Sequence, residues 1–157
     1  MKQHHYKTFL EWTGNLNNGT KDYKSYSRNH RVTIDGKQHS ILGSSDPSFR
    51  GDASRYNPEE LFLASISNCH MLWFLHLCSI NDIVVLEYLD HAMGVMEEDK
   101  TGSGHFTEVT LHPRVKIENA DMIDKANSLH EKANQFCFIA NSCNFKIKHQ
   151  PKTEVID

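Results

Sequence analysis

The chain has 157 residues, with 17 basic and 20 acidic side chains and a formal net charge of −3 at pH 7. This length suits one domain, over residues 1–157, that buries a sizeable core. The near balance of charge provides no basic stripe for nucleic acid and no polybasic segment for a membrane surface, so small or neutral partners are expected.

The N-terminal sequence MKQHHYKTFLEW has no apolar run of the kind found in signal peptides, so we expect a cytoplasmic protein. In that reducing compartment the four cysteines are expected to be free thiols or a working redox pair. A framework of structural disulfides is therefore not expected.

The first third of the chain predicts strands. Residues 6–13 and residues 23–34 mix aromatic and β-branched side chains with polar ones, and a turn-rich segment separates them. Asp35-Gly36 is a strong hairpin signal before residues 37–42. We therefore expect the chain to begin with three antiparallel strands.

A loop rich in Gly, Ser, Asp and Pro is expected next, at residues 43–56. It carries Arg50 and Arg55 to the start of the longest predicted helix. A nearby cation lowers the pKa of a thiol, so these arginines are candidates for activating a cysteine.

Residues 55–80 predict one long helix, around which the rest of the chain is organised. Asn57 is a good N-cap, Pro58 suits the first helical position, and Glu59 adds negative charge to the first turn. Apolar residues then fall on nearly every face, which predicts a helix surrounded by protein. Several polar residues interrupt the apolar run and argue against a membrane span.

The remainder predicts a second hairpin, a second helix and a last strand. Residues 83–98 and 105–117 are expected to pair, with Pro113 at an edge or a bulge. Apolar residues recur at helical spacing up to Cys137, and residues 144–149 form a short strand. This order predicts an α+β fold of about six antiparallel strands packed with two main helices.

Two cysteines stand out by position. Cys69 lies near the middle of the long helix, where a cysteine is more often a small core residue than a nucleophile. Cys137 lies at a helix end, and two such thiols could cycle between dithiol and disulfide. Cys78 is expected in the core, and Cys143 could be a spare or alternative thiol.

The eleven histidines invite a metal site, but the chain has no CxxC, no HExxH and no clustered ligand spacing. We expect neither a metal nor another cofactor. A Cys-His hydrolase is also disfavoured, because His70 and His76 are poorly placed and no third orienting group is evident.

Two segments resemble a known family. NPEELFLASISNCHMLWFL, which contains Glu59 and Cys69, resembles the signature of the OsmC/Ohr family of osmotically inducible and organic hydroperoxide resistance proteins. HEKANQFCFIANS, around Cys137, resembles its second motif. The resemblance implies an obligate homodimer that reduces organic hydroperoxides, with lipoyl-type dithiols as reductant. It implies Cys69 as the peroxidatic thiol, Cys137 as the resolving thiol and Glu59 as the carboxylate that holds an activating arginine.

The sequence departs from the family pattern beside both cysteines, since Asn68 and His70 flank Cys69 where apolar residues are often found. Phe138 follows the second cysteine, where the family commonly has proline. The resemblance does not decide which arginine activates the thiol, because the two branches of the family differ. The OsmC branch takes this arginine from the loop before the helix, which favours Arg50. The Ohr branch takes it from an early strand or turn, which favours Arg28. We favour Arg50.

Helix geometry predicts that the site is shared. Ten residues at about 1.5 Å rise separate Glu59 from Cys69 by about 15 Å, too far for one compact constellation. We therefore expect an intertwined two-fold dimer, with Glu59 and its arginine from one chain and the thiols from the other. The alternative is a non-catalytic module that binds a small hydrophobic molecule.

Overall fold

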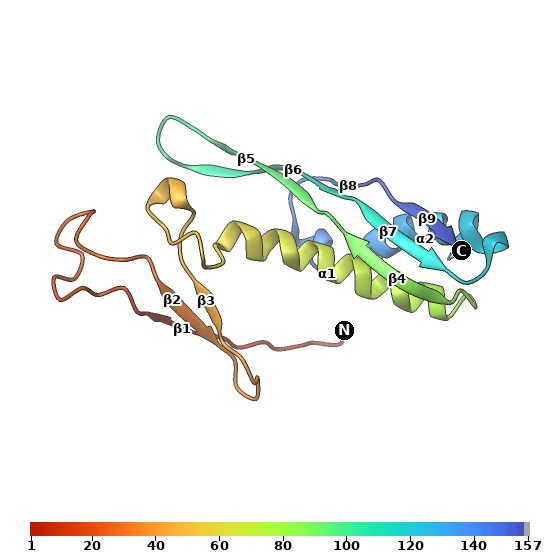
Figure 1. Ribbon diagram of the computed structural model, residues 1–157, viewed down its shortest axis with the longest axis horizontal. Coiled ribbons are helices and arrows are strands. Elements are labelled where there is room, and N and C mark those ends of the chain that lie inside the picture. Colours follow the sequence, from red (N-terminus) through yellow and green to blue (C-terminus); the bar gives the residue numbers. More distant parts are fainter. Residues whose placement is uncertain (156–157) are drawn as a thin grey trace. The chain divides into compact units, whose positions relative to one another are not determined.

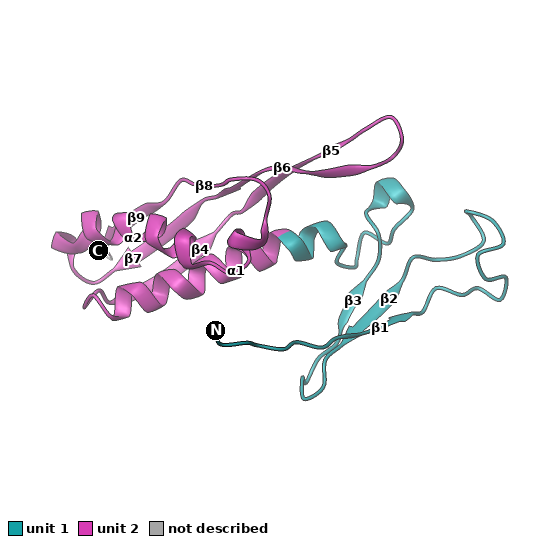
Figure 2. Cartoon of the chain, turned by 180° about the vertical axis from the view of Figure 1, so that it is seen from behind, with its two compact units in different colours: residues 1–62 teal, residues 63–157 magenta. Residues whose placement is uncertain are grey.

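The computed structural model describes residues 1–155. In chain order the elements are β1 (Phe9–Trp12), β2 (His30–Thr33), β3 (Ile41–Gly43), η1 (Pro47–Phe49), α1 (Pro58–Ser79), β4 (Val85–Asp90), β5 (Met93–Glu98), β6 (Gly104–Leu111), β7 (Pro113–Ile117), η2 (Ala120–Met122), α2 (Ile123–Phe136), η3 (Ala140–Ser142), β8 (Ile147–His149) and β9 (Lys152–Val155), where η marks a short 3-10 helix (Figure 1). The α+β class is confirmed. The chain divides into two compact units, residues 1–62 and residues 63–157 (Figure 2). One domain over residues 1–157 stays a prediction.

The first unit contains the sheet β1-β2-β3, whose neighbouring strands are antiparallel as expected. Val32 in the middle strand pairs with Leu10 on one side and Ile41 on the other. Phe9, Leu10 and Trp12 are exposed, and the buried apolar residues of the described chain all come from the second unit. This sheet therefore has no apolar core of its own.

The second unit is built on a long bent hairpin (Figure 1). β4 pairs with β7 and β5 pairs with β6, so each predicted strand is split in two. The bend lies where Pro113 lacks an amide and where the carboxylate of Asp90 accepts a hydrogen bond from the amide of His112, at 2.7 Å. The two halves of the hairpin consequently belong to different sheets.

The C-terminal strands correct the predicted topology. β8 runs parallel to β6, and β9, which the sequence did not predict, runs parallel to β7. The expected set of about six antiparallel strands is wrong, because the described residues form nine strands and two of the pairings are parallel. The chain passes through α2 between β7 and β9, and such a helical crossover brings the next strand back in parallel.

A side-chain cap begins α1, and another begins the short helix that precedes α2. The amide of Glu60 donates to Asn57 Oδ1 at 2.8 Å, and the amide of Asn57 donates to Glu60 Oε2 at 3.1 Å, which is a capping box. The Asn119 side chain caps η2, which leads directly into α2. The two helices pack with β7 around one apolar cluster: Phe74, Leu77, Cys78, Ile83, Val115, Ile117, Ala126, Leu129 and Ala133.

A single chain covers only part of α1, and a helix surrounded by protein in the expected dimer stays a prediction. Ile66, Phe74 and Leu77 are buried on one face, whereas Leu72 on another face is 62% exposed. By length and composition alone α1 could also cross a membrane, a test that core helices pass as well. Apolar residues on all sides therefore leave part of this helix uncovered.

Candidate functional site

The structure brings together the two thiols predicted to form a redox pair. Cys69 is half-buried on α1, and Cys137 is fully buried directly after α2. The two side chains lie close enough for Cys69 to raise the pKa of the Cys137 thiol. Both are free thiols in this structure, so the two neighbouring sulfurs are not linked.

The surroundings of Cys137 keep it protonated at neutral pH. Burial, followed by the hydrogen bond with Cys69, raises the pKa of the Cys137 thiol to about 12. The amide of Ala140 donates a hydrogen bond to Cys137 Sγ at 3.3 Å, which opposes part of this rise. The thiol is thus fixed in place by the turn that follows α2.

Aromatic side chains gather beside the segment that carries Cys137. Trp73 of α1 stacks on Phe136, with ring centroids 5.1 Å apart, and meets the edge of Phe138 at 5.8 Å. Phe138 is 66% exposed, and Trp73 also lines an open hollow of about 300 Å³ with Leu72 and His76. Phe138, which follows Cys137, therefore extends an apolar surface beside the thiol.

The predicted carboxylate lies at the far end of α1. Glu59 is in its first turn, and about 15 Å of continuous helix separates it from Cys69. Its Oε2 atom is buried and has no hydrogen-bond partner among the described residues. A buried carboxylate oxygen of this kind needs a donor, which an arginine can supply.

The candidate arginines differ in how firmly they are held. Arg28 donates from its guanidinium to the carbonyls of Tyr23, at 2.6 Å, and Tyr26, at 2.7 Å, and lies over both rings. Arg50 is exposed, adopts a left-handed backbone with φ 65°, and its guanidinium has no partner in the described part of the chain. Arg55 is paired with Asp52 at 3.4 Å.

The sequence analysis missed a buried pair of histidines behind the thiols. His70 and His130 are 1% and 2% exposed, and His70 Nε2 lies 3.0 Å from His130 Nδ1. Burial lowers the pKa of each imidazole to about 3, and neighbouring histidines add to the effect. Helical spacing could have revealed that His70 is buried, because it lies on the same face of α1 as Ile66, Phe74 and Leu77.

Neutral buried histidines make stability depend on pH. Below about pH 6.5 the unfolded chain binds protons at His70 and His130, whereas the folded chain does so only near pH 3. The free energy of unfolding should therefore fall by roughly 1–3 kcal/mol per pH unit as the pH drops from 6 to 4. Urea unfolding at several pH values measures this slope. A His70→Gln/His130→Asn variant should show a shallower slope, and equal wild-type stability at pH 7 and pH 4.5 would contradict the expectation.

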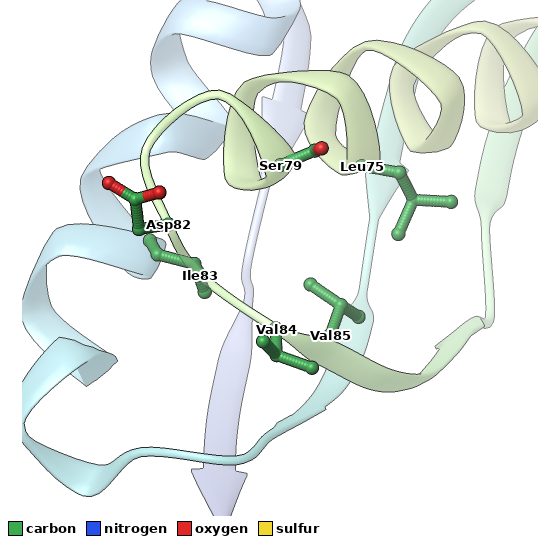
Figure 3. A pocket seen from close by; sticks show the side chains of 6 residues that line it. All are labelled: Leu75, Ser79, Asp82, Ile83, Val84 and Val85. Atoms are coloured by element: carbon green, nitrogen blue, oxygen red, sulfur yellow. The ribbon is translucent and has the colours of Figure 1, made fainter.

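The larger cavities do not contain the thiols. One, of about 510 Å³, lies where α1 ends and β4 begins (Figure 3), and another of the same volume lies between α2 and β8. The residues that line the first are Leu75, Ser79, Asp82, Ile83, Val84 and Val85. Among the described residues no group of three or more His, Cys, Asp or Glu side chains is arranged to hold a metal ion. The thiol pair with its aromatic neighbours is therefore the candidate site.

A family model and several solved structures match this chain. A family model described as OsmC-like protein matches residues 51–152. No curated protein matches the chain by sequence. Among solved structures, an OsmC-like protein of unknown function from Vibrio cholerae is 29% identical with a TM-score of 0.83. That match covers 98% of this chain and 100% of the other.

Two further structures carry names that refer to hydroperoxides. An organic hydroperoxide resistance protein from Elizabethkingia anophelis is 22% identical, with a TM-score of 0.70 and coverage of 98% of this chain and 100% of the other. The organic hydroperoxide resistance protein OhrB of Bacillus subtilis is 20% identical, with a TM-score of 0.63 and coverage of 94% and 98%. At these identities the likeness concerns the fold alone.

Proposed function

Because the chain belongs to the OsmC-like protein family, we propose that it is a thiol-dependent peroxidase that reduces organic hydroperoxides to alcohols. The observation that carries the proposal is the contact between the side chains of Cys69 and Cys137. Free thiols at this position suit the reducing cytoplasm, where a dithiol can restore them after each turnover.

The reaction proceeds in three steps. The Cys69 thiolate attacks the distal peroxide oxygen, the O–O bond breaks, and the alkoxide that leaves takes a proton to become the alcohol. The Cys137 thiol then attacks the sulfur of the Cys69 sulfenic acid, so that an S–S bond forms and water leaves. An external dithiol, of the lipoyl type, reduces this disulfide and is itself oxidised.

Each residue of the site has a distinct role in this proposal. Cys137 stays protonated because burial raises its pKa to about 12, so Cys69 is the thiol that meets the peroxide. Glu59 holds an arginine that favours the Cys69 thiolate. Arg50 is the first candidate because its guanidinium is free in the described chain, and Arg28 is the second. Trp73 and its aromatic neighbours receive the apolar part of the substrate.

The proposal includes an intertwined homodimer. A three-stranded sheet without buried apolar side chains is not stable by itself, and the sheet of the first unit is of this kind. Leu72 on α1 is likewise exposed within one chain, and a buried oxygen of Glu59 lacks a donor. A second copy that covers the sheet and α1 would meet these needs, with Glu59 and its arginine from one chain beside the thiols of the other.

Thiol mapping tests the reaction. A slight excess of cumene hydroperoxide should leave Cys69 and Cys137 joined in a disulfide, with Cys78 and Cys143 free, as measured by mass spectrometry of alkylated peptides. This pattern is expected because the two side chains are already in contact. If Cys69 and Cys137 both remain free, the chain is instead the non-catalytic module, and its open apolar hollow would bind a small hydrophobic molecule.

A further inference from the structure

A polar contact in the core joins the two helices that lead to the thiols. His70 follows Cys69 on α1, and His130 precedes Cys137 by seven residues, about two turns of α2. His70 Nε2 and His130 Nδ1 are 3.0 Å apart in the core. From this arrangement, and resting on the proposed function, we infer that the His70–His130 hydrogen bond is a positioning contact that holds Cys69 opposite Cys137.

Disulfide formation needs a fixed geometry. The Cα atoms of the two cysteines must lie about 4.4–6.8 Å apart, so small shifts of α1 along α2 oppose the reaction. The apolar cluster between these helices is non-directional and permits such shifts at little cost. A hydrogen bond between ring nitrogens has a preferred length and angle, and it therefore defines how the helices are aligned.

Stacked rings fix the orientation of the pair. The ring of Phe74 lies on His130, with centroids 3.9 Å apart and planes at 12°. The ring of His149, from β8, lies on His70 at 4.5 Å. Each imidazole is thus held between an aromatic neighbour and the other imidazole, so that the hydrogen bond between them cannot easily reorient.

The pair is costly for stability alone. His70 Nδ1, His130 Nε2 and His149 Nε2 are buried and have no hydrogen-bond partner in the described part of the chain. Burying such atoms costs about 1–3 kcal/mol each, and two apolar residues of similar shape would avoid this cost. A contact that lowers stability yet aligns two reactive groups is better explained by positioning than by packing.

The surroundings of the pair favour the neutral form of both histidines, because they offer little compensation for a charge there. The titratable groups that face the pair are Tyr88 and Asp90 on β4, His149 on β8 and, beyond it, Lys146. Asp90, the acid among them, already accepts hydrogen bonds from the Ser67 hydroxyl and the His112 amide. The pair therefore stays neutral at pH 7.5, where its hydrogen bond is tested.

Equilibration with glutathione tests the inference without any peroxide. At equilibrium with a known ratio of oxidised to reduced glutathione, the fraction of chains with a Cys69–Cys137 disulfide is measured. This fraction gives the effective concentration of the Cys137 thiol at Cys69. His130→Leu removes the hydrogen bond and should lower this value about tenfold relative to the wild type. Ile117→Ala, a control that weakens the same core from β7, should lower the melting temperature but change the effective concentration by less than about twofold.

A second variant separates positioning from simple loss of fold. His70→Gln/His130→Asn places amide groups near the positions of the two ring nitrogens, so it can keep a hydrogen bond that does not titrate. At pH 7.5 its effective concentration should stay within about twofold of the wild-type value, because it keeps a directional contact where His130→Leu does not.

The outcomes are distinct. The inference is overturned if His130→Leu matches the wild type, or if either Ile117→Ala or the double variant falls as far as His130→Leu. Should His130→Leu fail to fold, His70→Leu, which removes the same hydrogen bond, replaces it in both comparisons. A disulfide that forms with glutathione but never with hydroperoxide would instead refute the peroxidase while leaving the positioning contact intact.

Discussion

Cys69→Ser should reduce the turnover of cumene hydroperoxide, with dihydrolipoamide as reductant, by on the order of 10³-fold or more. A serine hydroxyl remains protonated at neutral pH and is a far weaker nucleophile toward a peroxide than a thiolate. The loss should appear in kcat/KM, because the step that fails is the first attack. Turnover by Cys69→Ser equal to that of the wild type would refute the proposed reaction.

Cys137→Ser should behave differently from Cys69→Ser. Its Cys69 can still attack one equivalent of peroxide, so a single burst of alcohol should form and a sulfenic acid should accumulate that dimedone traps. Cys143→Ser is the matched control, because a hydroxyl can keep the hydrogen bond that Cys143 Sγ donates to the Ile139 carbonyl. If Cys143→Ser accumulates the sulfenic acid and Cys137→Ser does not, Cys143 is the resolving thiol.

Mixing two inactive variants should restore activity if the site is shared between chains. Cys69→Ser subunits retain Glu59, and Glu59→Ala subunits retain both thiols, so each heterodimer should contain one intact site. Random exchange of equal amounts makes about half of the dimers mixed, and activity should recover to about a quarter of the wild-type value. Peroxide turnover measures the recovery, and native mass spectrometry measures the exchange.

The matched control combines Cys69→Ser with Cys137→Ser. Both thiols are expected from the same chain, where their side chains are in contact, so this mixture should form no disulfide on treatment with peroxide. Complete subunit exchange without recovery in the first mixture would show that Glu59 does not serve the thiols of the other chain. A monomeric active protein would exclude the shared site as well.

The sequence by itself determined the features that depend on neighbouring residues. Asn57 and Glu60 form a capping box because their separation of three residues is enough to bring side chain and amide together. The antiparallel start follows from short-range turn signals, and both helices follow from apolar spacing. The two cysteine motifs were also sufficient to single out Cys69 and Cys137.

Pairing between distant segments was decided only by the tertiary structure. Alternation marks residues 144–149 as a strand but contains no information about which strand it joins, so its parallel alignment with β6 was not predictable. β9 was missed for a related reason, since a four-residue polar strand is defined by its neighbour β7 rather than by its own pattern.

The pairing of His70 with His130 was likewise not predictable from the sequence. His70 and His130 occupy buried positions on two separate helices, and spacing alone indicates only that each faces a core. That they meet at 3.0 Å, remain neutral and lie behind the thiols depends on how α1 packs against α2. A hydrogen bond between residues 60 positions apart is a property of the packed core, because nothing in the local sequence of either helix specifies the partner.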